Sequence, residues 1–409
     1  MFKFLTQIIM KKIQILAVSA ILLFSVSCKK NGCMDPLANN YSAEAEKDNG
    51  TCDFSGNDIT EDIIVNTTWV AGKAYIIKND ISIHEDAVLT IEPGVIVKFE
   101  EFASLDVAYG NGFGTVKAVG TIDKPIIFTS NSIAKENGQW DGVILYDGAT
   151  DASEFVYCTF EYGGDNHPLF SARGCNVRFD YCTVKNSSSL GVEMDNGAGF
   201  TSFVGNSFNG NTEGPISLFA NYVHTLGTLN NFSTGSYVRI NSDHIETSGT
   251  ITWQKQNVPF YITGGLELGS SLGTKLILQP GSILKFDDDI LFDVGYYEKG
   301  ILEAIGTAAN PITFTSYSQF PSKGDWRGID FSSETGNGSK LEFCNIEYGG
   351  ANHGNVSMSL GGSNPVIVDV VNCNLTNSLH YGIYKDNLST VPNIAGTVFS
   401  GNTDGDKNW

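Results

Sequence analysis

One long segment of this 409-residue chain occurs twice. The stretch LTIEPGVIVKF, residues Leu89–Phe99, returns 187 residues later as LILQPGSILKF, residues Leu276–Phe286. Four further stretches return in the same order: Gly120–Ser130 as Gly306–Ser316, Gly138–Val143 as Gly324–Ile329, Phe155–His167 as Leu341–His353, and Asn206–Gly214 as Thr397–Gly405. Two long copies of one unit predict a repeat architecture, in which neighbouring units bury their apolar faces against each other.

A shorter period lies inside each copy. From about Asp58 onward, short strands with alternating apolar and polar residues are separated by Gly, Asn and Asp turns, without a long helical pattern. Cys158 and Cys182 lie 24 residues apart in similar contexts, and Cys344 and Cys373 lie 29 apart. This spacing fits one coil of a parallel β-helix, whose successive coils stack about 4.8 Å apart.

Two other all-β architectures explain less. A pair of β-sandwiches accounts for the long copy but not for the nested shorter period, and a propeller needs more equal blades. We therefore predict an all-β, single-stranded parallel β-helix made of two long internal repeats. The first repeat spans residues 58–244 and the second spans residues 245–409, continuous with the first, with an expected seam at Gly227–Thr250.

The repeated stretches also resemble a known group. LTIEPGVIVKF, the GT…PIIFTS stretch, the G-x-W-x-G pattern and the C-x-[FI]-E-Y-G-G pattern resemble right-handed parallel β-helix lipoproteins of Bacteroidetes, in the pectate-lyase-like superfamily. The resemblance covers about Asp58 to Trp409. It implies a right-handed helix, but it implies little about activity because that superfamily mixes lyases, hydrolases and adhesins.

Stacked coils place like side chains above one another. We expect apolar, cysteine and asparagine columns, the last through Asn186, Asn206, Asn209 and Asn211 and then Asn377 and Asn402. The repeat runs on to the final residues GNTDGDKNW without an evident cap. An uncovered final coil exposes strand edges, so we expect a partner or self-association at the C-terminal coil.

The first 28 residues have the pattern of an export signal. Lys11 and Lys12 precede the apolar run Ile13–Phe24, and Ser25–Cys28 closes the segment. This ending resembles a bacterial lipoprotein cleavage box, which implies a signal peptide at residues 1–27 and a lipid on Cys28. The expected location is the cell envelope, as an outer-membrane lipoprotein on either the periplasmic or the surface face. An ordinary cleaved signal or a core helix are the alternatives.

A small module follows the expected anchor, within residues 28–57. Gly32–Cys52 resembles a short disulfide-closed, calcium-binding motif common in secreted Bacteroidetes proteins, although Asn49 stands where that motif often has Asp. The resemblance implies a Cys33–Cys52 disulfide, which suits a segment too short for a core. It also implies calcium ligands at Asp35, Asn40 and Asp48, because calcium prefers carboxylate and amide oxygens. A disulfide-closed spacer without metal is the alternative.

The remaining cysteines are odd in number. With Cys28 lipidated and one disulfide formed, five are left: Cys158, Cys175, Cys182, Cys344 and Cys373. Parallel stacked side chains point the same way, which suits a ladder of thiols better than disulfide geometry. We therefore expect free buried thiols.

The charge balance restricts the partners. The chain carries 25 Lys and Arg against 45 Asp and Glu, a net charge of −20, which becomes −23 without Lys3, Lys11 and Lys12 of the leader. Phosphate backbones would be repelled, so we exclude nucleic acid as a partner. Cations, or neutral surfaces, are the more plausible partners.

No set of residues convincingly predicts catalysis. Asn402-Thr403-Asp404 and Asp287-Asp288 imitate two elements of β-helix polygalacturonases, but the G-H-G element is missing. The repeated acidic turns Glu100-Glu101 and Asp287–Asp289, near Asp106 and Asp293, are solvated turns or calcium sites. The ligand-binding candidates recur in both copies: Trp140, Trp326, Glu161, His167, Glu347 and His353. The tryptophans are candidate sugar platforms, or else pack against their own turns. The Glu and His pairs are a candidate duplicated site, with a turn-forming EYGG loop that carries a surface His as the alternative.

These observations favour an exported, lipid-anchored β-helix that acts as a non-catalytic binding or structural module, with polysaccharide as the candidate ligand. The alternative is a polysaccharide lyase or glycoside hydrolase of the β-helix class. A cluster of Lys or Arg with carboxylates on one face of the helix would favour a lyase, whereas a face without charged or aromatic clusters would favour a passive spacer.

Overall fold

The computed structural model describes residues 29–35, 38, 40–53, 57–110, 112–358, 365–391 and 393–409. The chain divides into two compact units, residues 1–55 and residues 56–409. The predicted signal peptide and the predicted lipidation site Cys28 lie outside the described residues. Within the described residues, no helix combines the length and the apolar character needed to cross a bilayer.

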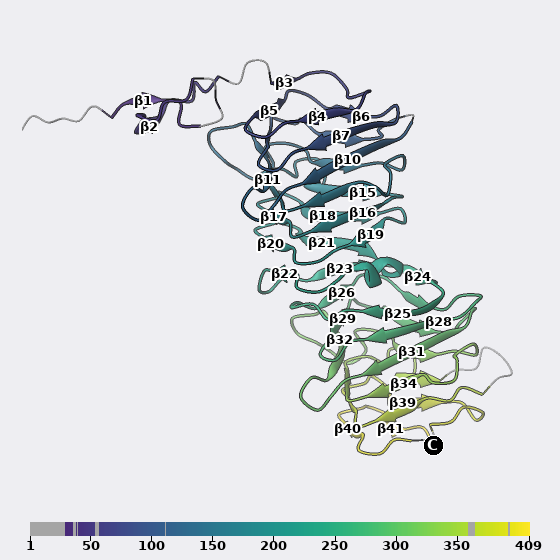
Figure 1. Cartoon of the computed structure of the whole chain (residues 1–409). Coiled ribbons are helices and arrows are strands. Elements are labelled where there is room, and N and C mark those ends of the chain that lie inside the picture. Colours follow the sequence, from purple (N-terminus) through teal and green to yellow (C-terminus); the bar gives the residue numbers. More distant parts are fainter. Residues whose placement is uncertain are drawn as a thin grey trace, which may run out of the picture. The chain divides into compact units, whose positions relative to one another are not determined.

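Residues 56–409 form a right-handed parallel β-helix, as predicted, in which the strands of successive coils lie side by side (Figure 1). Five parallel sheets build it, here called sheets I to V. Sheet III has 13 strands and runs through both repeats. Its strands, in order, are β6 (Ile81–Ile83), β9 (Leu105–Val107), β12 (Val143–Leu145), β15 (Phe170–Arg173), β18 (Leu190–Asp195), β21 (Gly214–Phe219), β23 (Val238–Asn241), β26 (Phe260–Ile262), β29 (Ile283–Phe286), β32 (Ile312–Ser316), β35 (Cys344–Glu347), β38 (Asn374–Thr376) and β40 (Val398–Ser400).

Two sheets belong to the first repeat. Sheet I contains β4 (Thr67–Trp69), β7 (Ala87–Ile91), β10 (Gly114–Val119), β13 (Glu154–Val156), β16 (Asn176–Asp180) and β19 (Gly199–Ser202). Sheet II contains β3 (Asp58–Ile59), β5 (Ala74–Ile77), β8 (Ile96–Phe99), β11 (Ile126–Ser130), β14 (Cys158–Glu161), β17 (Thr183–Lys185), β20 (Ser207–Asn209) and β22 (Asn231–Phe232). Each coil of this half therefore runs through sheets I, II and III in turn.

Two other sheets belong to the second repeat. Sheet IV contains β24 (Asp243–Ile245), β27 (Leu266–Leu268), β30 (Leu291–Val294), β33 (Gly328–Phe331), β36 (Gly354–Met358), β39 (Tyr381–Lys385) and β41 (Gly405–Lys407). Sheet V contains β25 (Gly249–Trp253), β28 (Thr274–Leu278), β31 (Gly300–Ile305), β34 (Lys340–Glu342) and β37 (Asp369–Val371). Each coil of this half runs through sheets V, III and IV.

The alternation of residues explains how each coil buries its core. In β7, Ala87, Leu89 and Ile91 are buried and the residues between them are partly exposed. Because strands pair in register, like residues meet in columns, such as Phe128 stacked on Phe160 with ring centroids 4.8 Å apart. The hydrophobic stacking predicted from the alternating sequence pattern therefore forms the interior of the helix.

The two repeats are turned relative to each other about the helix axis. The repeated sequence Ile96–Phe99 forms β8 in sheet II, but its copy Ile283–Phe286 forms β29 in sheet III. Sheets I, II and III of the first repeat thus correspond to sheets V, III and IV of the second. Since sheet III continues from β21 to β23, the second repeat is rotated by one face of the helix.

The seam where this rotation occurs includes a short helix. The 3-10 helix η1 (Ala220–Thr225) follows β21 in place of a strand and is followed by β22, the last strand of sheet II. Sheets IV and V begin directly afterwards, with β24 and β25. The changeover thus falls on η1 and on the predicted seam at Gly227–Thr250.

The stacked polar columns follow the same geometry. Asn206 is fully buried and accepts a hydrogen bond from the Cys182 backbone N–H at 2.8 Å. Its own backbone N–H donates to the Oδ1 atom of Asn230 at 3.0 Å. The five cysteines of the helix are free and buried, as predicted. Burial raises the pKa of the Cys175 thiol to about 12, so this thiol stays protonated at neutral pH.

The small unit is held by the predicted disulfide between Cys33 and Cys52. Its short parallel strands β1 (Asn31–Gly32) and β2 (Lys47–Asp48) pair in register. This confirms the disulfide implied by the motif resemblance, whereas the calcium site implied with it stays a prediction.

Candidate functional site

The predicted tryptophan platforms lie inside the helix. Trp140 and Trp326 are both fully buried and stack on Phe99 and Phe286, with centroid separations of 3.9 and 4.2 Å. Each indole N–H donates to the backbone carbonyl of the Glu in the EYGG turn, at 3.0 Å to Glu161 and 2.9 Å to Glu347. Neither ring is accessible to a sugar. Both tryptophans are therefore core residues, and the prediction that they bind a ligand is wrong.

The paired Glu and His candidates are not brought together. Glu161 accepts a hydrogen bond from Thr129 at 3.0 Å and pairs with Lys185 at 2.9 Å, on sheet II. Glu347 keeps the equivalent bond from Thr315, also at 3.0 Å. The histidines differ from each other, because His167 lines a cavity on sheet III while His353 is exposed and stacks on Tyr384. His167 is thus the one of these four residues that lines the cavity described next.

That cavity, here called the first acidic cavity, lies on the outer face of sheet III. Its volume is about 360 Å³, within the range of small-ligand sites. The lining consists of carboxylates, hydroxyl groups, one histidine and one aliphatic residue: Asp62, Asp80, Ser82, Ser104, Asp106, Tyr109, Asp141, Ile144, Tyr146 and His167. The rings of Tyr109 and Tyr146 lie 5.0 Å apart at its side.

A second acidic cavity of about 450 Å³ lies on sheet IV. It again combines carboxylates, one histidine and two tyrosines: Ser242, Asp243, His244, Gly265, Leu266, Glu267, Leu291, Asp293, Tyr296, Tyr297 and Asp330. The rings of Tyr296 and Tyr297 lie 4.3 Å apart. The Nε2 atom of His244 lies 3.5 Å from Glu267.

The two cavities are copies of one site. Asp106 on β9 and Tyr109 correspond to Asp293 on β30 and Tyr296, each pair being 187 residues apart. The neighbours in register differ between the copies. Asp106 lies between Ser82 and Ile144, whereas Asp293 lies between Glu267 and Asp330. The duplication therefore preserved the central Asp and its Tyr, while the surrounding carboxylates occupy different positions.

Each central aspartate is buried and incompletely hydrogen-bonded. Asp106 is 7% exposed and Asp293 is 9% exposed, and the Oδ1 atom of each has no hydrogen-bond partner among the described residues. Burial raises the pKa of Asp106 to about 7, with added repulsion from Asp80 and Asp141. Burial likewise raises the pKa of Asp293 to about 7, with added repulsion from Asp330. A buried carboxylate oxygen without a donor is uncommon in folded proteins, and its place in a cavity makes each aspartate a candidate to bind a ligand.

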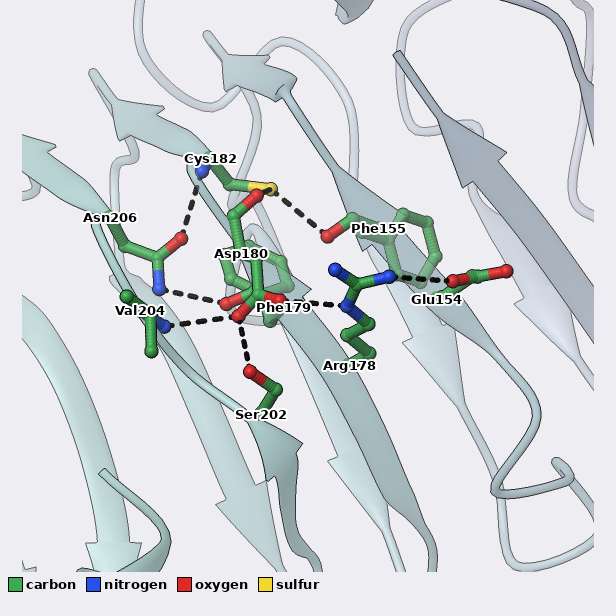
Figure 2. A network of polar contacts seen from close by, with 9 residues as sticks. All are labelled: Glu154, Phe155, Arg178, Phe179, Asp180, Cys182, Ser202, Val204 and Asn206. Carbon is green, nitrogen blue, oxygen red and sulfur yellow. Dashed lines mark hydrogen bonds and ion pairs between the residues drawn. The ribbon is translucent and has the colours of Figure 1, made fainter. Parts of the chain in front are cut away.

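A third buried aspartate shows what a purely structural carboxylate looks like in this fold. Asp180, 4% exposed, accepts bonds from Ser202 at 2.8 Å, from the Val204 backbone at 3.1 Å and from Arg178 at 2.7 Å (Figure 2). Arg178 in turn pairs with Glu154 at 3.3 Å. Both oxygens of Asp180 are therefore satisfied inside the protein, in contrast to Asp106 and Asp293.

Neither cavity has the geometry of a metal centre. Among the described residues, no group of three or more His, Cys, Asp or Glu side chains is close enough to hold a metal ion. In the small unit, Asn40 bonds the backbone of Thr51 and accepts from the Asp53 N–H at 2.7 Å, and Asp48 accepts from the Gly50 N–H at 3.0 Å. The predicted calcium ligand Asn40 thus holds the residues on both sides of Cys52, and Asp48 closes the turn that leads to it.

The acidic turns make ordinary surface contacts. Glu100 pairs with Lys78 at 3.1 Å, Asp287 accepts from the Tyr261 hydroxyl at 2.9 Å, and Arg327 lies 3.4 Å from Asp289. In the sequence, Asp106 and Asp293 stand out only as neighbours of these turns. The signal that identifies them is the repeated D-V-x-Y pattern, Asp106–Tyr109 and Asp293–Tyr296, which puts an acidic side chain on the outer face of a strand.

Comparison with known families agrees with the fold. Residues 58–205 match the family model of a pectate-lyase-like β-helix domain, a region that contains the whole first acidic cavity. Neither the curated proteins nor the solved structures give a significant match to this chain. The second cavity lies outside the matched residues and is related to the first through the internal repeat.

Proposed function

We propose that this protein is an exported, lipid-anchored β-helix that binds saccharides at its two acidic cavities. The observation that carries the proposal is the duplicated pair Asp106–Tyr109 and Asp293–Tyr296, with an unpartnered carboxylate oxygen in each cavity. Burial of a carboxylate oxygen without a hydrogen-bond donor costs free energy. Its presence in both copies is therefore best explained by a ligand that supplies the missing donor.

The chemistry of the lining suits hydroxyl-rich and amino-bearing sugars. Carboxylates and serine hydroxyls accept hydrogen bonds from sugar hydroxyls or ammonium groups, and tyrosine rings pack against the apolar side of a sugar ring. Acidic polysaccharides are disfavoured, because the cavities and the chain as a whole are strongly negative. The proposed ligand is therefore a neutral or amino-bearing glycan.

The remaining parts of the proposal concern location and assembly. Lipidation at Cys28 would hold the helix at the envelope, and calcium at Asp35, Asn40 and Asp48 would stabilise the small unit. Self-association at the C-terminal coil is supported by Val398 and Trp409, which are 56% and 50% exposed near the last strands.

Retention of the mature chain on polysaccharides tests the binding proposal. We expect retention on neutral or amino-bearing polymers, with or without calcium, and weak retention on acidic polymers. Asp106→Asn and Asp293→Asn should each weaken it, and the double variant should abolish it. Glu101→Gln and Asp288→Asn, which remove exposed charges from nearby turns, are the matched controls and should bind normally. Undiminished retention of the double variant would refute the assignment of the cavities.

A hydrolytic function is the second candidate. A carboxylic acid with a pKa near 7 beside other carboxylates is what a general acid requires in glycoside hydrolysis. A lyase fits these cavities less well, because neither is lined by a Lys or Arg among the described residues. Incubation with the retained polymers separates the candidates. New reducing ends that vanish in the double variant would establish hydrolysis, and their absence across the panel would leave binding alone.

A further inference from the structure

We infer that the protein bridges two separate glycan chains, because its two equivalent cavities open on different faces of one continuous helix. This inference rests on the proposed saccharide binding. It adds a cross-linking activity that a single binding cleft along one ledge would not have.

The face of each cavity follows from the sheet order. The central Asp106 lies on β9 in sheet III, whereas Asp293 lies on β30 in sheet IV. Sheet III itself continues past β30 on its own side of the helix, through β29 and β32. The rotation of the second repeat by one face therefore turns the second cavity away from the side on which the first cavity opens.

The cavities are also separated along the axis. On sheet III, seven strand-to-strand steps lead from β9 to β29, the strand in the same coil as β30. At about 4.8 Å per step this amounts to about 34 Å. A straight chain that left the first cavity along sheet III would pass Glu193, Arg239 and Tyr261 rather than the second cavity. One extended glycan thus meets one cavity.

The connection between the sites is stiff. In-register pairs join β21 to β23, Ile216 with Val238 and Leu218 with Ile240, and their side chains are fully buried. Among the described residues, no linker interrupts sheet III between the two cavities. The two sites therefore keep a fixed angle and cannot turn to the same side, and simultaneous occupation requires two chains or a chain that folds back.

Chitosan and mannan, each as a hexamer and as a long polymer, test this inference. Calorimetry with hexamers should give two sites in the wild-type chain and one in Asp106→Asn or Asp293→Asn. Light scattering with long polymer should rise with the wild-type chain near equivalence and fall again in excess protein. Neither single-site variant should raise it, and Glu101→Gln should behave as wild type. On a dense layer of the same polymer, wild-type retention should exceed that of either single-site variant by about 100-fold.

The outcomes separate the two proposals. Failure of both hexamers to bind would refute saccharide binding itself. Two bound hexamers without a scattering increase would overturn the bridging inference while leaving binding intact. Cross-linking by a single-site variant equal to that of the wild type would also overturn it, because it would indicate joining through another contact such as the C-terminal coil.

Discussion

The two repeats have the same coil structure, but the second is rotated about the helix axis relative to the first. Both repeats place the same Trp beneath the same EYGG turn and the same Asp on the same strand of the coil, yet the second is rotated by one face. Around the central Asp, Ile144 of the first copy is replaced by Asp330 of the second, and Asp141 by Arg327. Most buried positions thus stayed apolar, although residues such as Phe155 were exchanged for others such as Leu341. The cavities kept the central Asp and Tyr but take their other acidic side chains from different positions.

The difference shows which constraints act on each part. A core residue must fit its neighbours in the coils above and below, so packing restricts the position to apolar side chains that fill the space. A cavity must present charge and hydrogen-bond acceptors, which residues on any neighbouring strand can supply. Matched substitutions in the two repeats therefore separate the two kinds of constraint.

Removal of the buried indole should affect both repeats alike. Trp140→Ala and Trp326→Ala each delete a stacked ring and one hydrogen bond, and each should lower the free energy of unfolding by about 3–5 kcal/mol. Denaturant unfolding followed by circular dichroism measures this, with the exposed Trp409→Ala as the control. A loss in one repeat only would show that the copies are not equivalent in packing.

The central aspartates should destabilise the fold at alkaline pH. Their pKa of about 7 in the folded chain lies above the value of about 3.9 in an unfolded chain. Each side chain therefore contributes stability below about pH 4 that is lost as the pH rises through 7. Asp106→Asn and Asp293→Asn, which are neutral throughout, should raise the free energy of unfolding at pH 8 by about 2–4 kcal/mol each.

The same two variants should differ little from the wild type at pH 4, since the wild-type side chains are then protonated. Unfolding curves at pH 4, 6 and 8 measure the difference. Stabilisation together with weakened glycan retention would distinguish a binding residue from a structural one. A variant that loses stability at pH 8 would instead give the aspartate the structural role that Asp180 has.

A smaller effect is expected where the repeats use different polar residues. Asn206 accepts from the Cys182 backbone N–H at 2.8 Å, and the matched Thr397 accepts from the Cys373 N–H at 3.3 Å. Asn206→Ala should cost about 2 kcal/mol, because Asn206 is buried and also donates to the Phe179 carbonyl. Thr397→Ala should cost about 1 kcal/mol. Asn206→Thr should recover part of the loss in the same unfolding assay, and no recovery would show that the two columns are not interchangeable.

The sequence predicted the architecture because the fold repeats at short range. The alternation in Leu89–Ile91 reflects a strand with one buried face. The 24-residue spacing of Cys158 and Cys182 reflects one coil, as the pairing of Thr159 with Thr183 shows. The rotation of the second repeat was not predictable in this way. The rotation depends on η1 and the strands that start after it. The local sequence pattern of a repeated segment is the same whichever face of the helix the segment forms.

The candidate site was harder to predict for a related reason. Trp140 sits in a G-x-W-x-G pattern that suggests an exposed turn, but its ring fills the space that Gly163 leaves by lacking a side chain. A Cβ atom at Gly163 would lie 2.7 Å from the ring. The Trp and the EYGG turn are thus one packing unit. The first cavity gathers Asp62, Asp106 and Asp141 from separate coils, and only the three-dimensional stack brings them to one place.

The single sheet that crosses the seam has a consequence for how the chain folds. Most strands pair with strands one coil away, so structure can grow coil by coil from any point, as in other solenoids. Among the described residues, sheet II ends at β22 just after η1, and only sheet III, through the pair β21 and β23, carries strand pairing into the second repeat. Growth that arrives from the first repeat therefore has a single template on which to start the second. The seam is the place where folding should pause, and where a partly folded intermediate with one completed repeat should accumulate.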